Sequence, residues 1–83
     1  MTFLDKLILN DGQTIVHKDH KFKGSLQETD IDTYDVVDQE GVKVGDLVVI
    51  DHTAVKGFTR TVSVKQRDAK GNVLVETSWN PPR

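Results

Sequence analysis

Alternation of apolar and polar residues near the end of the chain is the feature that most constrains its fold. Residues 61–67 alternate Val62 and Val64 with polar side chains, and residues 73–79 alternate in the same way. Successive side chains of a β-strand point to opposite faces of a sheet, so a period of two predicts strands buried on one face. The polar stretch between the two segments contains Gly71, which tolerates the positive φ of a tight turn. The pattern therefore predicts a β-hairpin.

Further strands are predicted upstream of this hairpin. Residues 47–50 form a short apolar run rich in β-branched side chains, which is typical of a central strand. Residues 31–38 place Tyr34 and two valines among acids, and we expect a strand there as well. An Asp-Gly pair at residues 11–12 is a strong turn signal and leads into a strand that begins at residues 14–16.

Residues 2–9 fit two alternatives. If residues 7–9 are a strand, they form a hairpin with residues 14–16 across the Asp-Gly turn. Alternatively, Thr2 and Asp5 have the spacing of a capping box, and the apolar residues that follow line one face of a short helix. We favour the strand, although periodicity alone does not separate the two in so short a segment.

The predicted fold is all-β. Five or six short strands separated by turns, with no long helix, are typical of a small antiparallel barrel. A Src-homology-3-like barrel is our first expectation and an oligonucleotide-binding-type barrel our second. We expect one domain over residues 1–80, followed by a short Pro-rich tail at residues 81–83.

Composition excludes several classes of protein. The chain has no cysteine, which rules out disulfide scaffolds, thiolate zinc sites and cysteine nucleophiles. No apolar run approaches the roughly 20 residues that cross a bilayer, and the first residues lack the pattern of a signal peptide. We therefore expect no membrane association and a cytoplasmic location.

Charge is segregated along the chain, although the net charge is only −2. Residues 28–40 contain six acids and no base, whereas residues 56–70 contain five bases and one acid. Residues 17–23 add a second basic segment with two histidines. Ion pairs between acidic and basic strands are the simplest outcome, and segregated charge also steers and orients binding partners.

No metal or catalytic motif reaches the required pattern. His17 and His20 would lie on opposite faces of a regular strand, so a local turn would be needed to bring them together. The acids from Asp30 onward begin like a calcium loop but lack its glycine and final glutamate. Asp51 and His52 are adjacent in sequence and cannot relay a proton in an extended chain. We expect no metal, no cofactor and no enzymatic activity.

The sequence thus favours a non-enzymatic interaction module that binds an unidentified protein partner through its charges, and edge strands make a homodimer a further expectation. A weak nucleic-acid binder that uses the basic side with Phe22 and Tyr34 is the first alternative. A small metal-binding or catalytic protein is the second. The expected binding residues are, on a basic face, Lys56, Arg60, Lys65 and Arg67, and on an acidic face, Asp30, Asp32 and Asp35.

Overall fold

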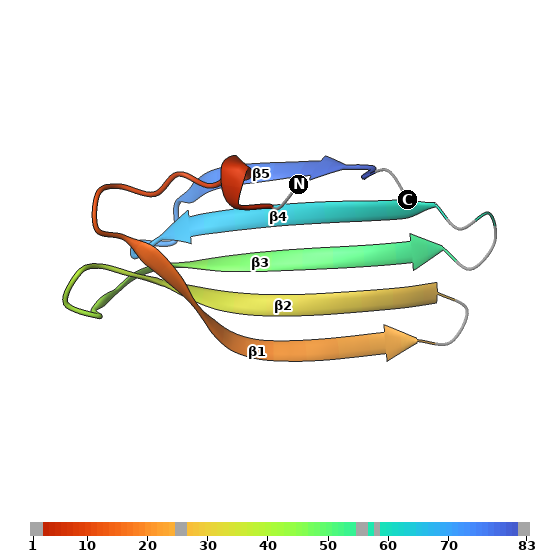
Figure 1. Cartoon of the computed structure of the whole chain (residues 1–83), viewed down its shortest axis with the longest axis horizontal. Helices are drawn as coiled ribbons and strands as arrows, with labels where there is room; N and C mark the ends of the chain where they lie inside the picture. The colour runs from red at the N-terminus through yellow and green to blue at the C-terminus, as the bar shows by residue number, and fades with distance from the viewer. Residues whose placement is uncertain (1–2, 25–26, 55–56, 58, 82–83) are drawn as a thin grey trace.

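Five antiparallel strands make up a single sheet in the computed structural model of this chain (Figure 1), which describes residues 3–24, 27–54, 57 and 59–81. The strands follow one another across the sheet in chain order. A short 3-10 helix, η1 (Phe3–Lys6), precedes them. The strands are β1 (Thr14–Gly24), β2 (Gln27–Val37), β3 (Lys43–Ala54), β4 (Arg60–Asp68) and β5 (Val73–Trp79).

The all-β class and the strand count agree with the sequence. The apolar run at residues 47–50 lies in the central strand β3, and β4 and β5 form the expected hairpin. Gly71 adopts a φ of 87° in the turn between them. The Asp68 carboxylate accepts hydrogen bonds from the backbone N–H groups of Lys70 and Asn72, which fixes that turn.

The expectation of a closed barrel is wrong, and neither the Src-homology-3-like nor the oligonucleotide-binding-type topology is confirmed. β1 and β5 lie at opposite edges of the sheet, and each pairs with a single neighbour. Closure requires strands that tilt and bend until the first meets the last. Here strands of up to 12 residues stay paired along most of their length, which gives an elongated molecule of 44 × 21 × 20 Å.

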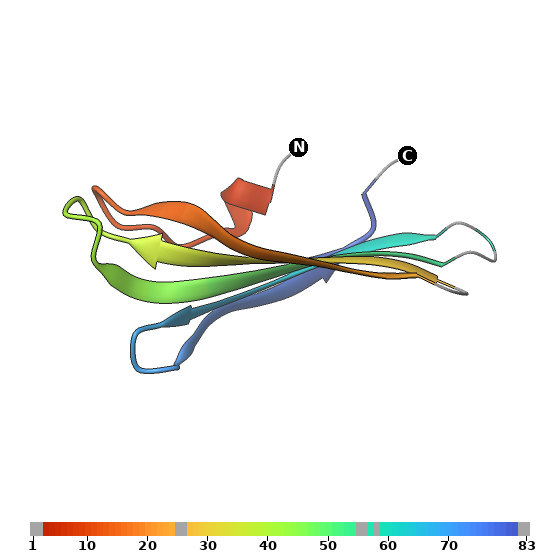
Figure 2. The same ribbon diagram turned by 90° about the horizontal axis from the view of Figure 1, so that it is seen from below.

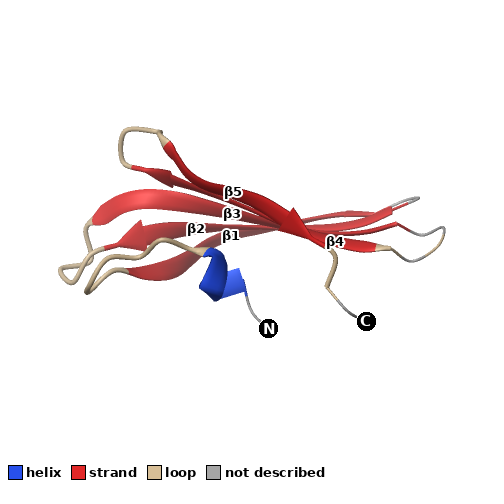
Figure 3. Cartoon of the chain, turned by 90° about the horizontal axis from the view of Figure 1, so that it is seen from above, coloured by secondary structure: helices blue, strands red, loops and turns tan. Residues whose placement is uncertain are grey.

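Strand alternation divides the sheet into two faces. One face, which we call the core face, carries the buried side chains of Leu47 and Val49 from β3 and of Val62 and Val64 from β4. The other, the open face, carries the residues that alternate with them. Figure 3 shows the strands as one layer, with the helix and the segment after it on one side only.

The N-terminal segment supplies the cover for the core face. Phe3 and Leu7 pack against the buried cluster, together with partly buried side chains of the sheet. The expected strand at residues 7–9 is wrong, because this segment crosses the sheet instead of pairing with β1. The turn that follows is present, with Gly12 at a φ of 80°. Burying the apolar side chains over the core outweighs the local preference for a hairpin.

Gln66 of β4 fastens this segment to the sheet. The Gln66 side chain is 2% exposed. The backbone N–H of Ile8 donates a hydrogen bond to Oε1 of Gln66 at 2.9 Å, and Nε2 of Gln66 donates one to the carbonyl of Ile8 at 2.8 Å. The side-chain amide of Gln66 thus satisfies the backbone N–H and C=O of Ile8, as the backbone of a neighbouring strand would. A buried glutamine is tolerated because both of its polar atoms are paired.

Across the part of the chain that the structure describes, no helix is long and apolar enough to cross a membrane.

We predict that Gln66→Leu destabilises the fold by about 1–2 kcal/mol, because it removes both hydrogen bonds from a partly buried backbone site. Urea unfolding followed by the fluorescence of Trp79 measures the change. Gln39→Leu, at an exposed position, is the matched control and should change the free energy of unfolding by less than about 0.5 kcal/mol. Equal effects of the two substitutions would show that Gln66 does not fasten the segment.

Candidate functional site

A β-bulge in β1 brings two histidines to the same face. His17 pairs with Tyr34 and Asp19 pairs with Thr33, so Lys18 is the extra residue. In a regular strand His17 and His20 would point in opposite directions, as the sequence analysis assumed. The bulge shifts the alternation by one residue, which places both histidines on the core face beside Asp32 of β2.

Asp32 is the shared partner of these histidines. Its Oδ1 lies 3.0 Å from Nε2 of His17 and 2.7 Å from Nδ1 of His20. Partial burial raises the pKa of the Asp32 carboxyl, but the hydrogen bonds from His20 and His17 and their positive charge outweigh it, so that its pKa is lowered overall. The hydrogen bond to Asp32 raises the pKa of His20, with smaller contributions from Asp30 and Asp19.

Two more carboxylates extend this polar cluster across the sheet. Asp30 Oδ1 lies 3.5 Å from Nε2 of His20. Asp51 of β3 is directly opposite Asp30 and accepts hydrogen bonds from the Arg60 guanidinium, one of them at 2.9 Å. Although histidine and carboxylate side chains gather here, the described residues contain no group of three or more His, Cys, Asp or Glu side chains arranged to hold a metal ion.

This cluster forms one wall of a pocket on the core face, which we call the acidic pocket. Its volume is about 380 Å³. Figure 2 shows helix η1 and the short segment after β5 on the same side of the sheet, and Phe3 and Pro81 from these two segments border the pocket. The lining residues are Phe3, His20, Asp30, Asp32, Tyr34, Val49, Asp51, Arg60, Val62, Trp79 and Pro81.

Aromatic rings also line the acidic pocket. The rings of Phe3 and Tyr34 are in contact, with 5.6 Å between centroids. The ammonium of Lys6 lies 5.2 Å from the centroid of the Trp79 ring, within the range of a cation–π interaction. Pro81, grouped with the tail in the sequence analysis, is half-buried and lines the pocket. The pocket therefore combines carboxylates, aromatic rings and a floor of valine side chains.

Three carboxylates line this pocket against one guanidinium, which gives a net charge of −2 when the histidine is neutral. A concave site with this charge and aromatic walls attracts cations that carry apolar carbon, such as lysine and arginine side chains.

The structure divides the expected acidic face. Asp30 and Asp32 lie on the core face at the acidic pocket, whereas Asp35 lies on the open face. There the Asp35 carboxylate is 3.3 Å from the ammonium of Lys43 and 3.9 Å from that of Lys18. The alternation along β2 separates these acids, as the sequence pattern itself implies.

The expected basic face is also divided. Lys65 and Arg67 share the open face, but Arg60 lies on the core face with Asp51. Lys65 is 3.5 Å from Glu76 and Arg67 is 3.3 Å from Asp46, so neighbouring strands compensate both charges. Lys56 lies outside the described residues.

The aromatic residues expected to stack on nucleic acid are not beside the basic strips. Tyr34 is half-buried under Phe3, and burial raises the pKa of its phenol. Phe22 is 58% exposed, but it pairs with Asp30 on the core face, while the flanking lysines of β1 point to the open face. Base stacking and phosphate binding would thus have to occur on opposite faces of the sheet.

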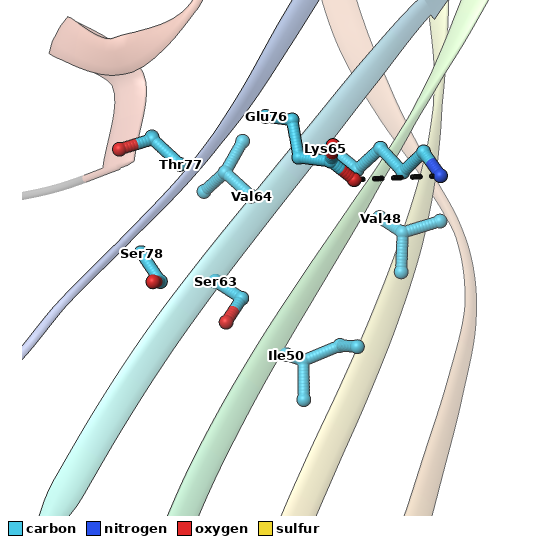
Figure 4. Close-up of a pocket in the computed structure, with 8 residues that line it drawn as sticks. All are labelled: Val48, Ile50, Ser63, Val64, Lys65, Glu76, Thr77 and Ser78. Atoms are coloured by element: carbon cyan, nitrogen blue, oxygen red, sulfur yellow. Dashed lines mark ion pairs between the residues drawn. The ribbon is translucent and has the colours of Figure 1, made fainter. Parts of the chain in front are cut away.

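A second hollow, of about 370 Å³, lies on the open face beside β5 (Figure 4). The Lys65–Glu76 ion pair spans part of it. It contains no aromatic ring and no unbalanced charge. Its lining residues are Val48, Ile50, Ser63, Val64, Lys65, Glu76, Thr77 and Ser78.

Sequence reasoning missed how the acidic pocket is assembled. It treated Asp51 only as a neighbour of His52, and it assigned Trp79 no part in a site. The pairing of Asp30 with Asp51 depends on the β2–β3 register, which local sequence does not reveal. The spacing of His17 and His20 was the one sequence signal for this site. The two side chains share a face only because of the bulge in β1.

Comparison with known proteins does not assign the chain to a family. No protein-family model matches it, and neither the curated proteins nor the solved structures contain a match. The geometry of the site therefore carries the functional argument.

We predict that the His20–Asp32 pair stabilises the fold most between about pH 4 and pH 6.5. The pKa of His20 is raised above its ordinary 6.5, so its contribution is complete below that pH and is lost as pH rises through the higher value. The pKa of Asp32 is lowered below 3.8, so its contribution is present above that pH and is lost on further acidification.

Urea unfolding of the wild type and His20→Gln at several pH values measures this. The stability lost on substitution should be larger at pH near 5.5 than at pH near 8.5. His52→Gln is the control, because His52 bonds the Thr29 hydroxyl and not a carboxylate. A pH-independent difference between the wild type and His20→Gln would contradict the assignment.

Proposed function

We propose that this chain is a non-enzymatic interaction module whose acidic pocket binds a basic segment of a protein partner. A lysine or arginine side chain of the partner enters the pocket, its charged group meets the carboxylates, and its carbon chain lies against the aromatic rings. The module positions the partner and does not change it chemically. The observation that carries the proposal is that Asp30, Asp32 and Asp51 line one pocket together with aromatic rings.

Cations of the chain itself already occupy the rim of this site. Lys6 lies over the Trp79 ring, and Arg60 is bonded to Asp51. The two contacts are of the same chemical kinds as those proposed for a partner. Asp30 and Asp32 are both paired with His20, which loses its positive charge as pH rises and then leaves these carboxylates able to attract another cation.

The charge balance of the two faces supports the choice of partner. At the acidic pocket the carboxylates outnumber the guanidinium. On the open face, ion pairs between neighbouring strands offset charges of both signs, as at Lys65–Glu76 and Arg67–Asp46. Electrostatic attraction is therefore strongest for a basic partner that approaches the core face. The separation of the aromatic rings from the lysines of β1 makes a nucleic acid the weaker proposal.

The binding of an acetylated oligolysine or oligoarginine peptide, followed by the fluorescence of Trp79 and by calorimetry at low salt, tests this proposal. We expect saturable binding that weakens as salt is raised, because screening reduces the attraction between opposite charges. Asp30→Asn should weaken binding by about threefold to tenfold, since it removes one carboxylate from the pocket.

Asp35→Asn is the matched control. It removes the same charge from the same strand but on the open face, so binding should stay near the wild-type value. Equal losses in the two variants would mean that only net charge matters. Binding of single-stranded DNA in place of the cationic peptides would replace the proposal with the nucleic-acid alternative.

A further inference from the structure

The sheet has two free edges, formed by β1 and β5. A free edge presents unpaired backbone N–H and C=O groups and pairs readily with another strand unless it is protected. The two edges of this sheet differ in their protection.

β1 carries the usual protection of an edge strand. Lysines at positions 18, 21 and 23 lie along it, and the bulge at Lys18 interrupts its regular pairing geometry. Lysine side chains and bulges both oppose the approach of another strand.

β5 carries no lysine, and its register irregularity is confined to its start. Glu76 is the one charged residue among its seven, and Lys65 of the neighbouring strand offsets that charge at 3.5 Å (Figure 4). Val73 is 49% exposed, and Thr77 and Ser78 are exposed. The irregularity of β5 lies near the start of the strand, between Val73 and Val75, which pair with Arg67 and Gln66. Residues 75–79 therefore form a regular edge, on which the paired Glu76 is the one charged residue.

We propose that β5 pairs with β5 of a second copy of this chain, in antiparallel orientation about a two-fold axis at Thr77. Thr77 is the middle residue of the regular part of β5. This register places Val75 opposite Trp79 of the partner subunit, a β-branched and aromatic pair of the kind that stabilises sheets, and it opposes the two threonines. It also sets Glu76 opposite Ser78 of the partner subunit, which avoids a contact between like charges.

The resulting assembly closes on itself. Residues that face each other in this register have the same parity, so the core faces of both copies lie on the same side of one ten-stranded sheet. A two-fold contact uses the β5 edge of each copy and leaves the two β1 edges outermost. An open-ended filament would need both edges of each copy to be accessible to another strand. A two-fold dimer needs one accessible edge per copy, which agrees with a protected β1 and a less protected β5.

The small size of the chain suggests that pairing of two β5 strands also stabilises the fold. A domain of 83 residues without disulfides has a small core, and oligomerisation is a common way to stabilise such a domain. The dimer buries the backbone groups of β5 that the monomer leaves at the edge.

Sedimentation equilibrium of the full chain from micromolar to near-millimolar concentration tests the proposal. The average mass should rise from 9.3 kDa toward twice that value. Thr77→Lys places two lysines opposite each other at the axis and should raise the dimer dissociation constant by about tenfold or more. Val16→Lys makes the same kind of change on the exposed surface of β1 and should leave the dissociation constant unchanged.

Hydrogen exchange provides a second measurement that does not depend on a variant. Amides of β5 should become more protected as the wild-type concentration rises, whereas amides of β1 should not. Circular dichroism establishes that both lysine variants keep the sheet. A wild-type mass of 9.3 kDa at every concentration would overturn the proposal, as would equal effects of the two substitutions.

Discussion

Cover of the core face by the N-terminal segment is the interaction on which the rest of this structure depends. A single sheet leaves both faces exposed to water, and a hydrophobic core forms only where a second layer packs on one of them. Phe3 and Leu7 provide that layer over Leu47 and its neighbours. The Gln66 side chain bonds both backbone groups of Ile8 and so fixes the segment in place.

The same arrangement creates the acidic pocket. Helix η1 covers the core face only in part, and beyond Phe3 the core face turns from valines to the carboxylates of β2 and β3. The C-terminal residues rise on the same side and complete the aromatic wall with Trp79. Apolar and charged groups therefore meet on the core face at the point where the cover by helix η1 ends. The two proposals share Trp79, whose ring lines the acidic pocket and whose backbone belongs to the β5 edge.

Charge in this protein is organised by strand pairing more than by sequence segments. The acids of residues 28–40 separate into two sets because alternate residues of β2 point to opposite faces. Asp30 and Asp32 meet histidines, while Asp35 meets lysines. The bases of β4 separate in the same way, with Arg60 on the core face and Lys65 on the open face. A segment that is basic in sequence thus does not become a basic surface.

The all-β class, the hairpin at residues 61–79 and the central position of residues 47–50 could be predicted from the sequence, because a period of two and a glycine turn are local signals. Three other features depend on contacts between residues far apart in the chain. The sheet is open, with β1 and β5 at opposite edges, and the N-terminal segment packs on one face instead of forming a strand because this buries Phe3 and Leu7. His17 and His20 meet Asp32 because a bulge shifts the alternation of β1. Asp30 meets Asp51 through the β2–β3 register, which is set by contacts between residues far apart in the chain.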